Sequence, residues 1–178
     1  MSSRMKLLTR SSLLLLALLA AFAPSALRAG EFSSDTISVG VVVSDLDKTL
    51  RFYTNVIGMK VAGSFAVDAA MGKKTGLTGG VPVTITMLRL GDGKDATDWK
   101  VMSFGKPATH PPREHLQDAT GMRYVTLHVT SLKPFLQRFK DNNVPLLGET
   151  PIPIGGGRHF ALVQDPDGIF VELIGPLE

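Results

Sequence analysis

An internal repeat constrains this chain more than any other feature, because the pattern that begins at Val39 begins again 86 residues later at Val125. In each copy apolar residues first alternate, which is typical of a strand with one buried face. The spacing then changes to that of an amphipathic helix. The apolar stripe of that helix consists of Leu46, Leu50, Tyr53 and Ile57 in the first copy and of Leu132, Leu136 and Phe139 in the second. The repeat therefore predicts two copies of one strand–helix module.

Capping residues mark the ends of both predicted helices. Ser44 precedes the first apolar stripe and is the expected N-cap, while Gly58 is placed to end that helix. In the second copy Thr130 or Ser131 takes the capping position, and Pro134 then falls near the first turn, where proline is tolerated. The two helices are thus expected to begin at equivalent positions of the repeat.

Further strands are expected after each helix, and one long insertion separates two of them. The strands are predicted at 59–67, 81–90 and 99–104 in the first copy, and at 158–164 and 169–174 in the second, after a hairpin at 151–157. Residues 68–80 contain four glycines and have no counterpart of equal length in the second copy. We expect this insertion to be either a mobile flap or slack between strands.

Two motifs in this pattern resemble a known family. Residues 43–59 read V-S-D-L-D-K-T-L-R-F-Y-T-N-V-I-G-M, and much later D-P-D-G at 165–168 is followed by V-E-L-I at 171–174. Proline and glycine make D-P-D-G a tight turn. Together these stretches resemble the vicinal oxygen chelate (VOC) superfamily of glyoxalase, bleomycin-resistance and extradiol dioxygenase proteins. The resemblance covers residues 37–176.

The resemblance implies an α+β fold of two βαβββ modules, whose mostly antiparallel sheets form a bowl. Module one would span about residues 37–106, a linker about 107–121, and module two about 122–177. In this family the bowl holds a small molecule, often over a divalent metal ion. Fold alone does not carry activity, so the function has to be argued from the residues that face the bowl.

The first 29 residues have the features of a secretory signal peptide. Arg4, Lys6 and Arg10 precede an uninterrupted apolar run at 13–23, and small residues lead to Ala29. The alternative is a membrane anchor, but crossing about 30 Å of hydrocarbon requires roughly 20 apolar residues, and this run is shorter. We therefore predict export with cleavage and a periplasmic or secreted mature protein.

Charge and cysteine content exclude several kinds of partner. The whole chain has 19 basic and 16 acidic residues, but four of the basic residues lie in residues 1–29, which leaves 15 against 16. A mature protein with net charge −1 has no basic footprint for nucleic acid, and no membrane association is expected after signal removal. The chain has no cysteine, which excludes disulfides and thiolate metal ligands.

The resemblance also indicates where a metal ion would be held. In metal-using members of the family, one ligand stands at the start of each module's first strand and another on each module's last strand. The corresponding residues here are Ser38, Met102, Tyr124 and Glu172. Histidine, glutamate or glutamine is expected at such positions, and only Glu172 meets that expectation. We therefore expect no metal and no other cofactor, and we expect these residues with His128 to bind an organic ligand.

Two alternatives remain open from the residues alone. His128, His159 and Glu172 would form a non-standard divalent metal site if all three faced the bowl. Glu172 would be a catalytic acid or base if burial raised its pKa, although pairing with Arg123 or a hydrogen bond from Tyr124 would account for it equally well. His110 and His115 flank two prolines and are interpreted as linker residues.

The leading prediction is an exported, glyoxalase-like protein that binds a small organic molecule in its bowl without the usual metal. The alternative is an enzyme, a lyase, isomerase or epimerase of the lactoylglutathione lyase type with a non-standard divalent metal site. The sequence leaves open whether the modules pair within one chain or are exchanged between two, so a homodimer is a further prediction.

Overall fold

The computed structural model describes residues 36–93, 95–105, 114–118 and 120–178. Residues 36–178 form one compact unit. The predicted signal peptide lies outside the described residues, as do most of the predicted linker and His110. Within the described ranges, no helix is both long and apolar enough to cross a membrane.

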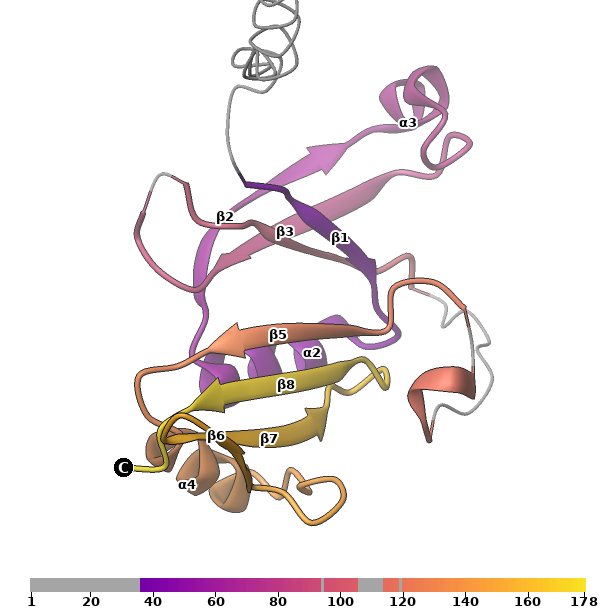
Figure 1. Ribbon diagram of the computed structural model, residues 1–178. Helices are drawn as coiled ribbons and strands as arrows, with labels where there is room; N and C mark the ends of the chain where they lie inside the picture. The colour runs from indigo at the N-terminus through magenta and orange to yellow at the C-terminus, as the bar shows by residue number, and fades with distance from the viewer. Residues whose placement is uncertain (1–35, 94, 106–113, 119) are drawn as a thin grey trace, which may run out of the picture. The chain divides into compact units, whose positions relative to one another are not determined.

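The first sheet contains four strands in the spatial order β1-β4-β3-β2 (Figure 1). The strands are β1 (Val39–Val42), β2 (Lys60–Val67), β3 (Val83–Arg89) and β4 (Trp99–Met102). The pair β1 and β4 is parallel, while the pairs β4–β3 and β3–β2 are antiparallel. The last strand of the module thus lies beside the first and runs in the same direction.

The second sheet repeats this topology in the order β5-β8-β7-β6. Its strands are β5 (Tyr124–His128), β6 (Ile152–Gly155), β7 (Arg158–Gln164) and β8 (Phe170–Gly175). Again the first and last strands pair in parallel, and the other pairs are antiparallel. The predicted α+β fold of two βαβββ modules with mostly antiparallel sheets is confirmed.

The helix in module one begins one residue later than expected and changes type halfway. Helix α2 (Leu46–Arg51) is capped by Asp45, whose carboxylate accepts a 2.9 Å hydrogen bond from the backbone N–H of Lys48, so Ser44 is not the cap. The chain continues as a π-helix, η1 (Phe52–Ile57), which ends at Gly58 with φ of 92°. The left-handed conformation at that glycine is the helix end that the sequence predicts.

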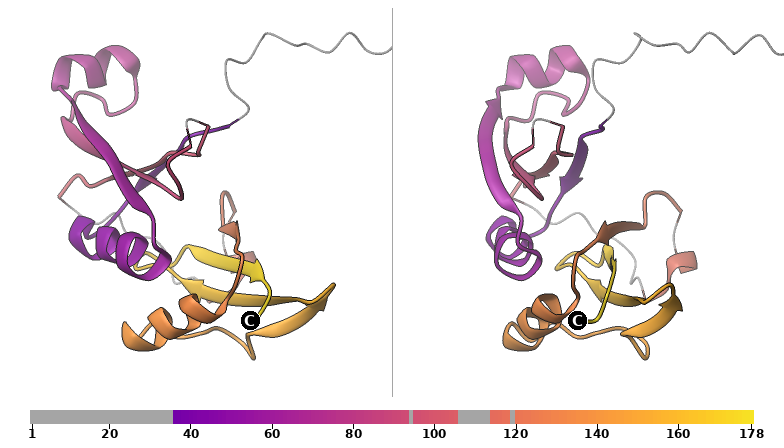
Figure 2. Two further views of the ribbon diagram at one scale, coloured as in Figure 1. Left: turned by 90° about the vertical axis from the view of Figure 1, so that its left-hand side faces the viewer. Right: turned by 60° about the vertical axis from the view of Figure 1, so that its left-hand side comes forward.

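The helix of module two, α4 (Lys133–Asp141), begins after Leu132 and has no side-chain cap at that position. Ser131, one of the two predicted caps, instead accepts a 3.2 Å hydrogen bond from the backbone N–H of Lys133. In the linker, residues Leu116–Asp118 form a short 3₁₀ helix, η2. Views from the side show α4 against one face of the second sheet (Figure 2).

The glycine-rich insertion contains a helix, α3 (Ala69–Thr75), at the end of the β2–β3 hairpin (Figure 1). The carboxylate of Asp68 caps this helix by accepting a 2.7 Å hydrogen bond from Met71 N–H. Gly76 ends the helix with φ of 76°, a conformation that favours glycine. An N-cap and a C-terminal glycine thus define a helix within the insertion, which is therefore more than slack between strands, and the mobile flap stays a prediction.

The core is formed by the alternating residues and helical stripes that the repeat predicts. Tyr53, Leu132 and Phe139 are almost fully buried, and residues of both modules belong to one apolar cluster. The fully or largely buried members on the strands, or just after β1 in the case of Val43, are Val43, Leu88, Trp99, Val101, Leu127, Ala161, Val163, Val171 and Leu173. Burial of these side chains leaves the intervening strand residues on the opposite face of each sheet.

Buried polar contacts connect the two modules at the D-P-D-G turn. Tyr53 donates a hydrogen bond from its hydroxyl to Asp165 at 2.9 Å, and both side chains are buried. Asp167 accepts a 3.1 Å hydrogen bond from Ser44 N–H at the start of module one's helical segment. Desolvation raises the pKa of both Tyr53 and Asp165. The turn predicted at residues 165–168 thus also makes polar contacts with module one.

Candidate functional site

Each sheet has one face covered by helices and core residues and one face that is more open. We call the open faces the module-one face and the module-two face. The module-one face is formed by Gly40, Val42, Gly63, Phe65, Ile85, Met87, Lys100 and Met102, as the pairing register shows. The module-two face is formed by Tyr124, Thr126, His128, Phe160, Leu162, Glu172 and Ile174. Strand alternation places these residues opposite the core, so four of the five predicted ligand-binding residues, all except Ser38, belong to these faces.

The strand register changes one of the predicted positions. Glu172 pairs with Thr126 on the first strand of module two. The residue that the repeat makes equivalent to Thr126 is Gly40, and Gly40 pairs with Lys100. Lys100, and not Met102, is therefore the module-one counterpart of Glu172. Met102 lies on the same face, two residues further along β4, and its role in ligand binding stays a prediction. The sequence does not reveal how the loop before β4 sets this register.

Ser38 precedes β1 and takes part in a polar network on module one. Asp98 accepts a 2.5 Å hydrogen bond from Arg89 Nε, and Ser38 lies close to this carboxylate. The Arg89 guanidinium, more than any other group, lowers the pKa of Asp98. A neutral hydroxyl is a weaker ligand for a divalent ion than the histidine or carboxylate expected at this position.

Glu172 is partly buried and interacts with a neighbouring strand. Its carboxylate accepts a 2.7 Å hydrogen bond from the Thr126 hydroxyl. The sequence suggested two other partners for Glu172, namely Arg123 and Tyr124. Arg123 instead donates a hydrogen bond to the carbonyl of Leu116, and no hydrogen bond joins Tyr124 to Glu172. Tyr124 is 48% exposed, so its ring is available on the open face.

The three residues of the alternative metal set do not share one face. His128 pairs with Ile174 and lies on the same face as Glu172. His159 pairs with Gly175, an odd number of residues from the Glu172 pair, and therefore lies on the opposite face. The structure thus separates His159 from the other two. His115, the linker histidine that the structure describes, is exposed.

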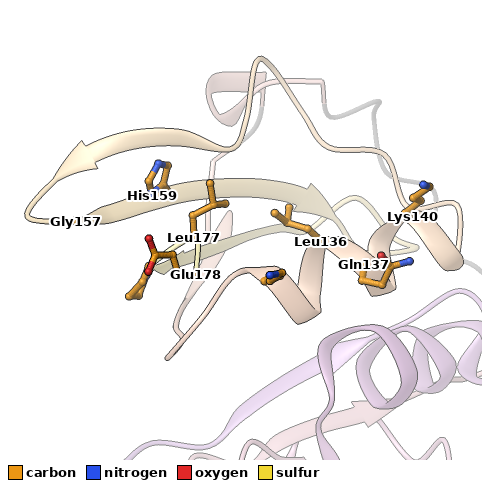
Figure 3. A pocket seen from close by; sticks show the side chains of 9 residues that line it. Leu136, Gln137, Lys140, Gly157, His159, Leu177 and Glu178 are labelled. Atoms are coloured by element: carbon orange, nitrogen blue, oxygen red, sulfur yellow. The ribbon is translucent and has the colours of Figure 1, made fainter.

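His159 lines a different cavity, of about 1170 Å³, between α4, the β6–β7 hairpin and the C-terminal residues (Figure 3). The Nδ1 atom of this histidine is buried and has no hydrogen-bond partner. The cavity is lined by Lys133, Leu136, Gln137, Lys140, Gly157, His159, Pro176, Leu177 and Glu178. It is separate from both open faces, since none of its lining residues belongs to them.

The donor set at the four family positions does not fit a divalent ion. Those positions are Ser38, Lys100, Tyr124 and Glu172, and only one of them is a carboxylate. A protonated lysine has no lone pair to donate, and it repels a cation. In the part of the chain that the structure describes, no group of three histidine, cysteine, aspartate or glutamate side chains is arranged to hold a metal ion.

A family model named Glyoxalase/Bleomycin resistance protein/Dioxygenase superfamily matches residues 36–173 of this sequence. The chain belongs to this superfamily. Membership confirms the VOC resemblance of the sequence motifs. The VOC domain is also 28% identical over 144 residues to a protein named 2-epi-5-epi-valiolone epimerase from Actinomyces sp., and the alignment covers 76% of each chain.

Solved structures share the VOC fold. A glyoxalase family protein from Bacillus cereus has a TM-score of 0.67 at 22% identity, with 86% of this chain and 100% of that chain covered. The trypanothione-dependent glyoxalase I of Leishmania major has a TM-score of 0.55 at 23% identity, with 78% and 84% covered. Identities this low support a common fold and leave the activity open.

Sequence reasoning missed Lys100 as a residue of the VOC site. A usable signal was present, because W-K-V-M alternates buried and open positions in the same way as V-E-L-I. Matching the apolar residues Trp99 and Val101 to Val171 and Leu173 would have aligned Lys100 with Glu172.

Proposed function

We propose that this VOC protein is exported to the periplasm or the exterior and binds a small organic molecule on its open faces without a divalent metal ion. The observation that carries the proposal is the pair of equivalent residues Lys100 and Glu172, one on each module. In a metal site both would be electron-pair donors. Here one is a cation and the other a single carboxylate, a combination that suits polar contacts with an organic ligand.

Individual residues of the faces have distinct expected roles. Tyr124 offers an exposed ring on which a ligand can stack and a hydroxyl that can donate a hydrogen bond. Glu172 and His128 offer polar contacts on the same face, while Met102 offers an adaptable apolar surface. Ser38 lies at the polar end of module one, next to Asp98.

Exposed apolar side chains support the further proposal of a homodimer. Val42 is 57% exposed and Phe65 is 42% exposed, and both lie on the module-one face. A second copy that covered this face would bury them and would give the ligand a second wall. Light scattering coupled to size-exclusion chromatography measures the mass directly, and a monomer at all concentrations would contradict the dimer.

Metal content of the purified mature protein tests the metal-free proposal. We expect far less than one equivalent of any divalent metal by plasma mass spectrometry, and we expect the affinity for a neutral hydrophobic dye, N-phenyl-naphthylamine, to be unchanged by a chelator. Glu172→Gln is the matched variant, because it keeps the shape of the side chain and removes its charge. One firmly bound ion per chain that is lost in Glu172→Gln would refute the proposal.

A second candidate is an enzyme that acts next to a carbonyl group, as a lyase, isomerase or epimerase, with Glu172 as acid or base. The relative named as an epimerase favours it, as does the partly buried Glu172 carboxylate with its single hydrogen bond from Thr126. In this case Glu172→Gln would abolish turnover and leave ligand affinity within a few-fold. Under the binding proposal neither the wild type nor the variant has turnover.

A further inference from the structure

Three cations lie on the strands of the first sheet, and two of them have carboxylate partners. Lys60 Nζ lies 2.6 Å from Asp92, and Arg89 Nε lies 2.5 Å from Asp98. Among the described residues, no carboxylate lies within ion-pair distance of Lys100. Asp98 feels the charge of Lys100 only at longer range, and its carboxylate is paired with Arg89.

The neighbours of Lys100 leave its side chain accessible from the open face. Across the sheet it lies in the row Gly40–Lys100–Met87–Gly63, so a glycine stands next to it on β1 and another stands beyond Met87 on β2. The methyl group of Met102 lies 3.5 Å from the point where a Cβ on Gly40 would be placed. Lys100 is partly buried between these two methionines. A partly desolvated ammonium beside apolar groups attracts an anion more strongly than one in water does.

The next row across the sheet is wholly apolar. It consists of Val42, Met102, Ile85 and Phe65, in the order of the strands. The two outer members of this row are among the exposed large hydrophobic residues of the chain. A molecule with an anionic group over Lys100 would therefore place its apolar body on this row.

We propose that Lys100 binds an anionic oxygen of the ligand, and that the ligand carries a carboxylate or comparable anionic group on a compact apolar body. This inference rests on the proposed function and adds the chemical class of the ligand to it. Lys100 supplies the positive charge, and the row with Val42 and Phe65 supplies the apolar contact. Arg89 does not compete for the anion, because Asp98 neutralises it.

Two fluorescent dyes with the same aromatic skeleton test the role of the charge. Anilinonaphthalene sulfonate is anionic, and N-phenyl-naphthylamine is its neutral counterpart. We expect Lys100→Met to weaken sulfonate binding about tenfold, the typical loss of one charge-assisted contact, and to leave the neutral dye unchanged. Lys100→Arg should keep both affinities within about twofold. Lys140→Met is the control, because Lys140 lines the separate cavity of Figure 3.

The outcomes distinguish this inference from the proposed function. If Phe65→Ser weakens binding of the neutral dye but Lys100→Met does not affect the sulfonate, ligands bind the face and the anion inference is refuted. If neither dye binds the wild-type protein, the proposed function fails with the inference. If both dyes bind and neither Phe65→Ser nor Lys100→Met affects them, the ligand site lies off the module-one face and the inference alone is refuted. If Lys140→Met alone weakens the sulfonate, the anion site lies in the cavity near His159, which also refutes the inference.

Discussion

Removal of one buried hydroxyl should destabilise the protein measurably. In Tyr53→Phe, the Oδ2 atom of Asp165 loses its 2.9 Å hydrogen bond, and nothing else changes in size. Tyr53 is fully buried and Asp165 is 6% exposed, so water cannot replace the hydroxyl donor unless the packed residues of the two modules move apart. Loss of a hydrogen bond to a buried charged group costs about 2 kcal/mol in the free energy of unfolding at neutral pH.

The size of this loss should depend on pH in a defined direction. Desolvation raises the pKa of Asp165 in the folded protein, so burial of this carboxyl lowers stability once the pH rises above that folded pKa. Below the pKa of the unfolded chain, about 4, the carboxyl is neutral in both states and this penalty disappears. The Tyr53 hydroxyl mainly stabilises the charged form. We therefore expect the loss in Tyr53→Phe to fall to about half near pH 4.

Urea unfolding followed by tryptophan fluorescence measures this loss, because the chain has a single tryptophan, Trp99, in the core beside Tyr53. The matched control is Tyr124→Phe, the same chemical change at the only other tyrosine, which is 48% exposed. That variant should lose less than about 0.5 kcal/mol at either pH. Equal losses in the two variants at neutral pH, or a loss in Tyr53→Phe that grows on acidification, would contradict the reasoning.

Four further predictions concern contacts outside this pair. Arg138 Nε donates a 2.6 Å hydrogen bond to the Val56 carbonyl in the π-helix, so Arg138→Met should cost about 1–2 kcal/mol in urea unfolding, while exposed Lys140→Met on the same helix should be neutral. Asp167→Ala removes the acceptor for Ser44 N–H and should cost about 1 kcal/mol. By contrast, Asp92→Ala breaks an exposed ion pair and should cost less than about 0.5 kcal/mol. Arg89→Met should raise the pKa of Asp98 in carboxyl-detected NMR, whereas Arg158→Met on the other sheet should not.

The fold was readable from the sequence because apolar periodicity determines which side of each element is buried. Strand alternation and helical stripes placed Tyr53, Leu132 and Phe139 in the core, where the structure has them. The repeat then determined topology, since two equal modules produce two sheets of equal strand order. Strand alternation and helical stripes reflect the free energy gained by burying many apolar side chains. The prediction of the fold therefore does not depend on any single residue.

Local polar details were less predictable, because several residues can satisfy the same backbone group. Ser44 and Asp45 are both good N-caps, and the structure uses Asp45. The insertion looked irregular on account of its glycines, but Asp68 and Gly76 make it a capped helix. The π-helical turn at Phe52–Ile57 preserves the apolar stripe and therefore leaves no trace in the sequence period.

The candidate site was the least predictable part of the structure, because its side chains contribute little to the core. Residues such as Lys100 and Met102 alternate with the core and contribute little to it, so the fold tolerates many side chains at these positions. A shift of two residues keeps a strand residue on the same face and leaves the burial pattern intact, which is why the sequence pattern did not separate Met102 from Lys100. The same freedom means that a lysine can stand opposite Gly40 without disturbing Trp99 or Val101 behind it. Family membership is thus fixed by the buried residues, whereas the chemistry depends on open-face residues that the fold does not constrain.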